Sequence, residues 1–105
     1  MQRMCFLLQV KQDQLREYLE AHEVWPEELA AMREAGLRNY SLSYRPDGLI
    51  VGYLEGEDIQ ASLCQLAETE VEARWQECMA PFFEALPGSP AGDRREWLTP
   101  YFYLA

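Results

Sequence analysis

The sequence is poor in the residues that build metal sites. Its 105 residues include one histidine, His22, and three cysteines. Zinc sites built on histidine pairs are therefore excluded, and Cys5, Cys64 and Cys78 are too far apart for the C-x-x-C spacing of cysteine-based sites. A glycine-rich phosphate loop, a nucleophile elbow and a dinucleotide fingerprint are also lacking. We expect a protein without a metal or any other cofactor.

Positive charge is scarce as well. Nine lysines and arginines stand against 18 aspartates and glutamates, which gives a net charge of -9, and the only lysine is Lys11. Contacts with a phosphate backbone depend on clustered basic side chains, so this balance argues against nucleic acid and anionic membranes as partners. A neutral ligand meets no such electrostatic penalty.

Long apolar runs are missing. No run approaches the ~20 residues of a membrane-spanning helix, and no basic-then-apolar signal segment opens the sequence. An odd number of cysteines is typical of a protein that keeps its thiols reduced. We therefore expect a cytoplasmic protein that folds as a single domain over residues 1–105, a length sufficient for one hydrophobic core.

Hydrophobic periodicity divides the chain into strands and helices. The first ten residues alternate, with Phe6, Leu8 and Val10 on one face, as in a strand. The complete pattern predicts a strand over 1–10, helices over 11–23 and 26–36, a hairpin of strands over 37–44 and 49–55, helices over 57–67 and 69–82, a loop over 87–95 and an aromatic strand over 97–104.

Boundary residues support this division. Pro26 is well placed as the first residue of a helix, and Gly36 as the residue that follows its end. Thr69 and Glu72 form a capping-box pattern at the start of the last helix. The side chains expected to face inward from residues 26–36 are Leu29, Met32 and Ala35. The three cysteines are expected to be small core residues.

The order strand, helices, hairpin, helices, strand matches the ferredoxin-like β-α-β-β-α-β fold. This is an α+β architecture with a four-stranded antiparallel sheet and helices on one face. The uncovered face is expected to show Cys5, Leu7, Tyr40 and Tyr53, which are too apolar to face water. Apolar patches of this kind mark partner surfaces or ligand clefts. We therefore predict a homodimer of the dimeric α+β barrel type.

Tyr18 and His22 are the sharpest candidates for a functional site. Their i, i+4 spacing places them on one face of a helix, within reach of a common ligand. Histidine is the side chain best suited to proton exchange near neutral pH. The alternative is structural: the ring of Tyr18 packs on the sheet, and His22 ends the helix, where the helix dipole favours it.

The remaining aromatic and acidic residues have two interpretations. Trp25 and Trp75 could line a pocket with flat aromatic surfaces suited to a sugar, or they could pack in the core. Strand tyrosines such as Tyr40 and Tyr44 carry the same ambiguity. The acidic residues of the last helices are expected to form a solvated face. These are Glu68, Glu70, Glu72 and Glu77.

Several segments in a shared order resemble the L-rhamnose mutarotase family. They cover essentially the whole chain, and their common order and spacing carry more weight than any one of them. In chain order they are Gln9-Val10, Glu17-Tyr18 with His22, Trp25-Pro26-Glu27, Gly36 followed by Asn39-Tyr40-Ser41, Arg74-Trp75, and Phe102-Tyr103-Leu104.

The resemblance implies a small dimeric α+β isomerase that interconverts the α and β anomers of L-rhamnose. It implies that His22 is the proton donor and that Tyr18 and Tyr40 contact the sugar. Members of the family complete the pocket with two adjacent tryptophans, where this chain has Trp75 and Gln76. The substrate-binding residues expected from the resemblance are therefore Tyr18, Tyr40, Trp75 and Gln76, and the departure at Gln76 bears on sugar preference.

Mutarotation suits these residue types. Opening the sugar ring requires one proton donor and one proton acceptor, and it needs no metal, nucleotide or covalent intermediate. We therefore expect an aldose 1-epimerase that acts on a neutral monosaccharide, L-rhamnose or a related 6-deoxy sugar, with His22 as the catalytic residue. Two alternatives stay open: a sugar- or small-molecule-binding module without catalysis, and a dimeric ferredoxin-like enzyme of other chemistry, such as a monooxygenase.

Overall fold

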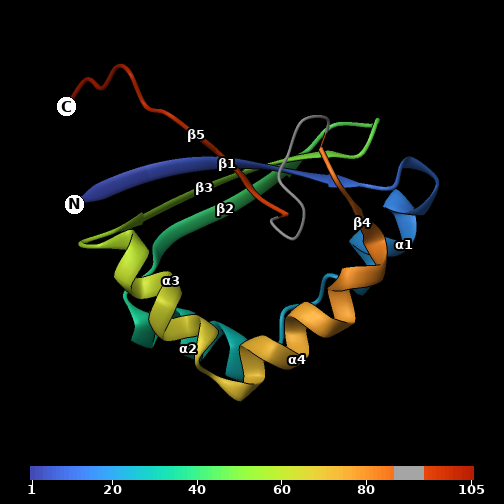
Figure 1. Ribbon diagram of the computed structural model, residues 1–105, viewed down its shortest axis with the longest axis horizontal. Helices are drawn as coiled ribbons and strands as arrows, with labels where there is room; N and C mark the ends of the chain where they lie inside the picture. Colours follow the sequence, from blue (N-terminus) through green and yellow to red (C-terminus); the bar gives the residue numbers. More distant parts are fainter. Residues whose placement is uncertain (87–93) are drawn as a thin grey trace.

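The computed structural model describes residues 1–86 and 94–105, which form a curled antiparallel sheet with helices on one face (Figure 1). The strands are β1 (Gln2–Val10), β2 (Arg38–Tyr44), β3 (Leu49–Gly56), β4 (Phe83–Glu84) and β5 (Glu96–Leu98). The sheet order is β2-β3-β1-β4, and β5 also pairs with β1. All pairings are antiparallel, which confirms the ferredoxin-like α+β prediction.

The helices lie beneath the sheet in Figure 1. Their bounds are α1 (Leu15–Ala21), α2 (Pro26–Ala35), α3 (Ile59–Ala67) and α4 (Glu70–Met79), with short 3-10 helices η1 (Gln12–Gln14) and η2 (Ala80–Phe82). The boundary predictions are confirmed: Pro26 opens α2, Gly36 follows it with a φ of 102°, and the Thr69 side chain caps α4. Among the described residues, no helix is both long and apolar enough to cross a membrane.

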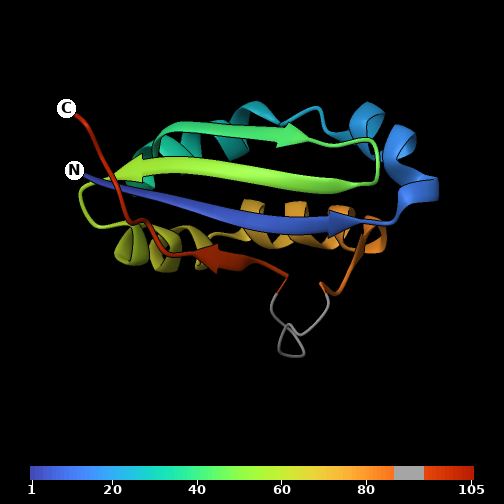
Figure 2. The same ribbon diagram turned by 90° about the horizontal axis from the view of Figure 1, so that it is seen from above.

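Two short strands, β4 and β5, pair with β1 where a single fourth strand was predicted. β4 pairs with the end of β1 at Gln9 and Val10, whereas β5 pairs with its middle at Cys5, Phe6 and Leu7. Figure 2 shows β5 beside β1. The predicted loop over 87–95 lies outside the described residues, except for Arg94 and Arg95.

The predicted closing strand is too long. Pairing stops at Leu98, and the four apolar residues near the carboxyl end are exposed instead of lying in the sheet: Tyr101, Phe102, Tyr103 and Leu104. The aromatic pattern indicated a strand, but a strand needs a neighbouring edge to bond to. Within the described residues, the tail makes a contact through Tyr103, whose ring lies 3.2 Å from the guanidinium of Arg3.

The core lies between the sheet and the helices. Phe6, Leu8 and Val10 face the helices from β1, and Ile50 and Leu54 face the same way from β3. This alternation is the one predicted from the sequence. The prediction that the three cysteines are core residues is wrong for Cys64 and Cys78, which are exposed. Cys5 is only partly buried and lies on the open face of the sheet, where it was also expected.

The orientation of α2 also differs from the prediction. Leu29 is 38% exposed, whereas Glu28 is completely buried. Glu28, Met32 and Ala35 stand at i, i+4 and i+7 and therefore share one face, which is the face packed inward. A carboxylate on the inner face of a helix is uncommon unless it has a partner, and this one lies next to the pocket described below.

Gly52 sets how closely β1 and β3 can pack around Phe6. A Cβ at position 52 would lie 2.1 Å from the ring of Phe6, which is itself fully buried. We predict that Gly52→Ala lowers the free energy of unfolding by about 3 kcal/mol, because the ring cannot move without breaking its packing. Urea titration followed by circular dichroism measures the effect. Ser43→Ala, at an exposed position of β2, is the control and should change stability by less than ~0.5 kcal/mol.

Candidate active site

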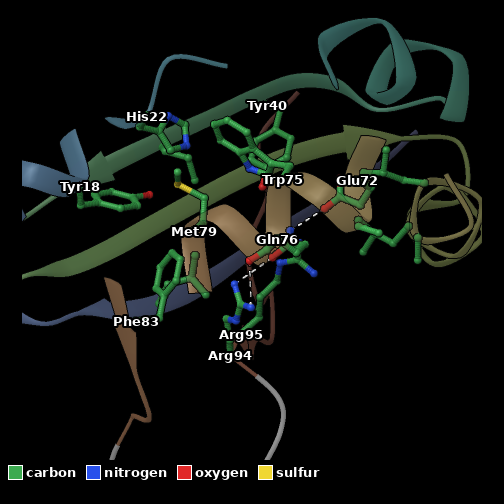
Figure 3. A pocket seen from close by; sticks show the side chains of 16 residues that line it. Tyr18, His22, Tyr40, Glu72, Trp75, Gln76, Met79, Phe83, Arg94 and Arg95 are labelled. Atoms are coloured by element: carbon green, nitrogen blue, oxygen red, sulfur yellow. Dashed lines mark hydrogen bonds between the residues drawn. The ribbon is translucent and has the colours of Figure 1, made fainter. Parts of the chain in front are cut away.

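A pocket of about 400 Å³ lies between the inner face of the sheet and α4. This is within the ~300–1,000 Å³ usual for small-molecule sites. It is lined by all five residues expected at the site from the sequence, namely Tyr18, His22, Tyr40, Trp75 and Gln76 (Figure 3). Residues from α1, β2 and α4, far apart in sequence, thus meet at one cavity.

Tyr18 and His22 form one end of the pocket. Their ring centroids are 5.4 Å apart, and the ring of Tyr18 also packs on Phe82 and Phe83 at 5.8 and 5.5 Å. Burial, with a smaller effect of nearby Tyr40, raises the pKa of Tyr18 to about 12. The Tyr18 hydroxyl therefore remains a neutral hydrogen-bond donor throughout the physiological pH range.

His22 directly follows α1, at the position that ends the helix. The side chain is partly buried, and burial lowers the pKa of His22 below its ordinary value of 6.5. The neutral imidazole is therefore the main form at pH 7. His22 therefore ends a helix and also lines the pocket.

Trp75 connects His22 to α2. Its ring meets the ring of His22 at 5.3 Å and that of Trp25 at 5.2 Å, both nearly perpendicular. Such edge-to-face contacts are favourable and define ring orientation. Trp75 is 6% exposed and lines the pocket, so it is both a core residue and a wall of the site, whereas Trp25 supports it from behind.

Tyr40 does not lie on the open face of the sheet as predicted. Ser41 pairs with Tyr53 on the open face, so its neighbour Tyr40 points to the opposite side, as Leu42 does. The irregular pairing between Arg38 and Ser41, where Asn39 has a φ of 47°, lies before this point. Tyr40 lies on the covered side, with its ring edge-on to Phe6 at 6.1 Å. Burial raises the pKa of Tyr40, an effect that Arg95 partly offsets.

Gln76 lies in a polar network on α4. Its side-chain nitrogen donates a hydrogen bond to Oε1 of Glu72, and its oxygen accepts one from Arg94 at 2.9 Å. These opposed partners orient the amide, and its second N–H has no acceptor among residues 1–86 and 94–105. Figure 3 shows this network on the side of the pocket away from Tyr18.

Glu72 was expected on a solvated helix face and is instead buried, at 7% exposure, in the wall of the pocket. The sequence contained a usable signal, because Glu72 precedes Trp75 by three residues and therefore shares its face of α4. Arg94, Arg95, Met79 and Phe83 also line the pocket without having been predicted.

The two other strand tyrosines considered from the sequence lie outside the pocket. Tyr44 is 56% exposed, and Tyr53 pairs with Cys5 on the open face, where its hydroxyl donates a hydrogen bond to Glu55. Among the described residues, no group of three or more histidine, cysteine, aspartate or glutamate side chains is placed to hold a metal ion. The site therefore offers aromatic surfaces, phenol hydroxyls, one imidazole and one amide–carboxylate network.

Fold and pocket together define a ferredoxin-like α+β protein with an aromatic small-molecule site. Its structure resembles that of the L-rhamnose mutarotase from Formosa agariphila, with a TM-score of 0.79, 22% identity and complete coverage of both chains. At this identity the likeness establishes the fold.

Sequence similarity establishes the family. Residues 3–104 match the family model for L-rhamnose mutarotase. The chain is 36% identical over 110 residues to an L-rhamnose mutarotase of Listeria monocytogenes serovar 1/2a, with complete coverage of both. It is 29% identical over 102 residues to an L-fucose mutarotase of Xanthomonas campestris pv. campestris, covering 90% of this chain and 81% of that protein. The chain belongs to the L-rhamnose mutarotase family.

The buried carboxyl of Glu28 gives a test of the site's electrostatics. Burial, together with neighbouring Glu72, raises the pKa of Glu28 to about 8 from 4.5. A raised pKa means that the folded state binds the proton more tightly, so this contribution to stability is complete below about pH 4.5 and disappears as the pH rises through 8. Glu28→Gln removes the titration.

We predict that the stability of the parent relative to Glu28→Gln decreases between pH 5 and 8.5, by on the order of 2 kcal/mol. Urea melts of both proteins across this range measure it. Taking the difference cancels the groups that do not interact with Glu28, such as His22. A constant difference across the range would show that Glu28 has the same proton affinity in the folded and unfolded states.

Proposed function

We propose that the protein interconverts the α and β anomers of L-rhamnose or a related 6-deoxy sugar, with His22 as the proton-transferring residue. The observation that carries this proposal is the position of His22, the only histidine of the chain, in an aromatic-lined pocket of a member of the mutarotase family. The relatives named for L-rhamnose and for L-fucose set the range of sugars to be tested.

The chemistry is a reversible ring opening. The O1–H proton of the sugar leaves to a base, its electron pair forms the C1=O1 carbonyl, the C1–O5 bond breaks, and O5 takes a proton from an acid. Rotation about the C1–C2 bond and closure on the other carbonyl face reverse both transfers. His22 acts as the acid toward O5, and the same residue recovers that proton when the ring closes.

The other predicted site residues hold the sugar. Trp75 packs against an apolar face of the ring, as aromatic side chains do in sugar sites. The hydroxyls of Tyr18 and Tyr40 donate hydrogen bonds because the pKa of each is raised and both stay protonated. Gln76 adds an amide at the opposite wall. The substrate is neutral, so the acidic charge of the chain does not oppose binding.

The protein is also proposed to act as a homodimer in the cytoplasm. The open face of the sheet carries Cys5, Leu7 and Tyr53, with Val51 and Leu98 each 39% exposed. An apolar face of this kind is typical of a surface that pairs with a second sheet. Sedimentation velocity tests this, with a dimer expected at micromolar concentration.

Anomer exchange tests the activity directly. Saturation-transfer NMR with L-rhamnose should show exchange between the anomers far faster with micromolar protein than in buffer alone. His22→Ala should reduce the catalysed rate at least ~100-fold, because a positioned acid–base group contributes about that much. Glu20→Ala, on the exposed side of α1, is the control and should match the parent. Parent protein that only binds the sugar, without faster exchange, would identify a binding module.

The pH dependence tests the role of His22 as an acid. Because burial lowers the pKa of His22, the protonated form becomes more abundant as the pH falls below 6.5. We predict that the catalysed exchange rate, with the buffer rate subtracted, rises between pH 7.5 and 5.5. Tyr18 and Trp75, which contact His22, do not titrate in this range. A rate that falls toward low pH would instead make the neutral imidazole the active form.

A further inference from the structure

Two buried carboxyl groups lie beside the pocket, and the proposed reaction uses neither. Glu72 on α4 is 7% exposed and lines the cavity, whereas Glu28 on α2 has no exposed surface. Both oxygens of Glu28, and Oε2 of Glu72, are buried without a hydrogen-bond donor from the described residues. Buried polar atoms normally have partners, so three such oxygens in one place need an explanation.

A proton shared between the two carboxyl groups explains two of the three, one oxygen of Glu28 and Oε2 of Glu72. Glu72 lies close enough to Glu28 to contribute, after burial, to the raised pKa of Glu28. Two ionised carboxylates can only accept hydrogen bonds and repel each other. If one of them holds a proton, it donates to the other and both gain a partner. Glu28 is the more deeply buried of the two and therefore has the higher cost of carrying a charge. The pair is then a carboxylic acid at Glu28 and a carboxylate at Glu72.

The position of Glu72 indicates what its carboxylate can contact. Figure 3 shows Glu72 on the far side of Tyr40 and Trp75 from Tyr18, so it faces a different part of a bound ligand from the part that meets Tyr18 and His22. The Oε1 atom of Glu72 accepts from Gln76, which is in turn bonded to Arg94. A carboxylate beside an amide and a guanidinium offers acceptors and donors together, which suits the paired hydroxyls of a sugar ring.

We propose that Glu72 binds ring hydroxyls of the sugar on the side away from His22, and that Glu28, protonated behind it, positions its carboxylate. This inference rests on the proposed function and adds a specificity-determining residue to it. The anomeric carbon then points toward His22 because the hydroxyls at the other end of the ring are held. The ligand class is a neutral sugar with free hydroxyls remote from the anomeric centre.

Other charged and titratable groups face the pair and define its surroundings. Tyr40 on β2 and Arg95 interact electrostatically with one another, and Glu28 and Glu72 both act on Tyr40. Arg94 reaches the network through Gln76. Gln76 donates to Oε1 of Glu72, and Arg94 donates to Gln76, so neither donates to Oε2 of Glu72. They therefore do not replace the donor that Glu28 supplies.

Steady-state anomer exchange of Glu72→Ala tests the proposal. We expect the KM for L-rhamnose to rise at least tenfold, with kcat within about threefold of the parent. Glu77→Ala, exposed on the same helix, is the matched control and should leave both constants unchanged. Circular dichroism verifies that each variant is folded. A fall in kcat at constant KM would overturn the proposal by placing Glu72 in proton transfer, and unchanged constants would remove it from the site.

Sugar analogues identify the hydroxyl that is bound. The analogues are the 2-deoxy, 3-deoxy and 4-deoxy forms of L-rhamnose. One of them should bind the parent protein more weakly than L-rhamnose does, but should bind Glu72→Ala as well as L-rhamnose does. This loss should then be non-additive in a substrate–variant cycle. Full additivity for all three analogues would contradict contact between Glu72 and a ring hydroxyl.

Glu28 is tested by conservative rescue. Glu28→Gln retains a donor of the same shape and should keep KM within about threefold, whereas Glu28→Leu removes the donor and should raise KM as much as Glu72→Ala does. Equal KM values for the two variants would overturn the positioning role. If the parent does not catalyse exchange, the quenching of tryptophan fluorescence by L-rhamnose measures binding by the same variants, so the proposed function and this inference fail separately.

Discussion

The site depends on the packing of Trp75 against His22 and Trp25. These two perpendicular ring contacts, at 5.3 and 5.2 Å, attach the end of α1 and the start of α2 to α4. They place the chain's one imidazole over a cavity whose other walls come from the sheet. Without this packing, His22 would be an ordinary residue at a helix end. Burial of the ring lowers the pKa of His22.

Much of the fold could be predicted because it depends on local patterns. The alternation of β1, the cap at Thr69, the proline that opens α2 and the glycine that follows it each act within a few residues. The closing strand and the face of Tyr40 could not be predicted in the same way. The length of the closing strand depends on how much of it finds an edge to pair with, and alternation along β2 does not show which of its two faces meets the helices.

The residues of the candidate site also differ in how far the sequence predicts them. Tyr18 and His22 are visible as an i, i+4 pair, and the family resemblance added Tyr40, Trp75 and Gln76. The two acids were missed because charge in a helix usually faces water, and no sequence pattern shows that α2 turns Glu28 inward in place of Leu29. With a single histidine, the chain has one side chain suited to proton transfer near neutral pH. Among its many carboxyl groups, those of Glu28 and Glu72 are buried.

A crystal structure with bound L-rhamnose would show whether His22 transfers the proton. We expect the sugar in the pocket against Trp75, with a ring nitrogen of His22 about 2.6–3.2 Å from the ring oxygen, within hydrogen-bond reach. The sugar hydroxyls on the far side should contact Glu72 and Gln76. A sugar bound elsewhere, or bound here with His22 directed away from the anomeric centre, would rule out this role of His22.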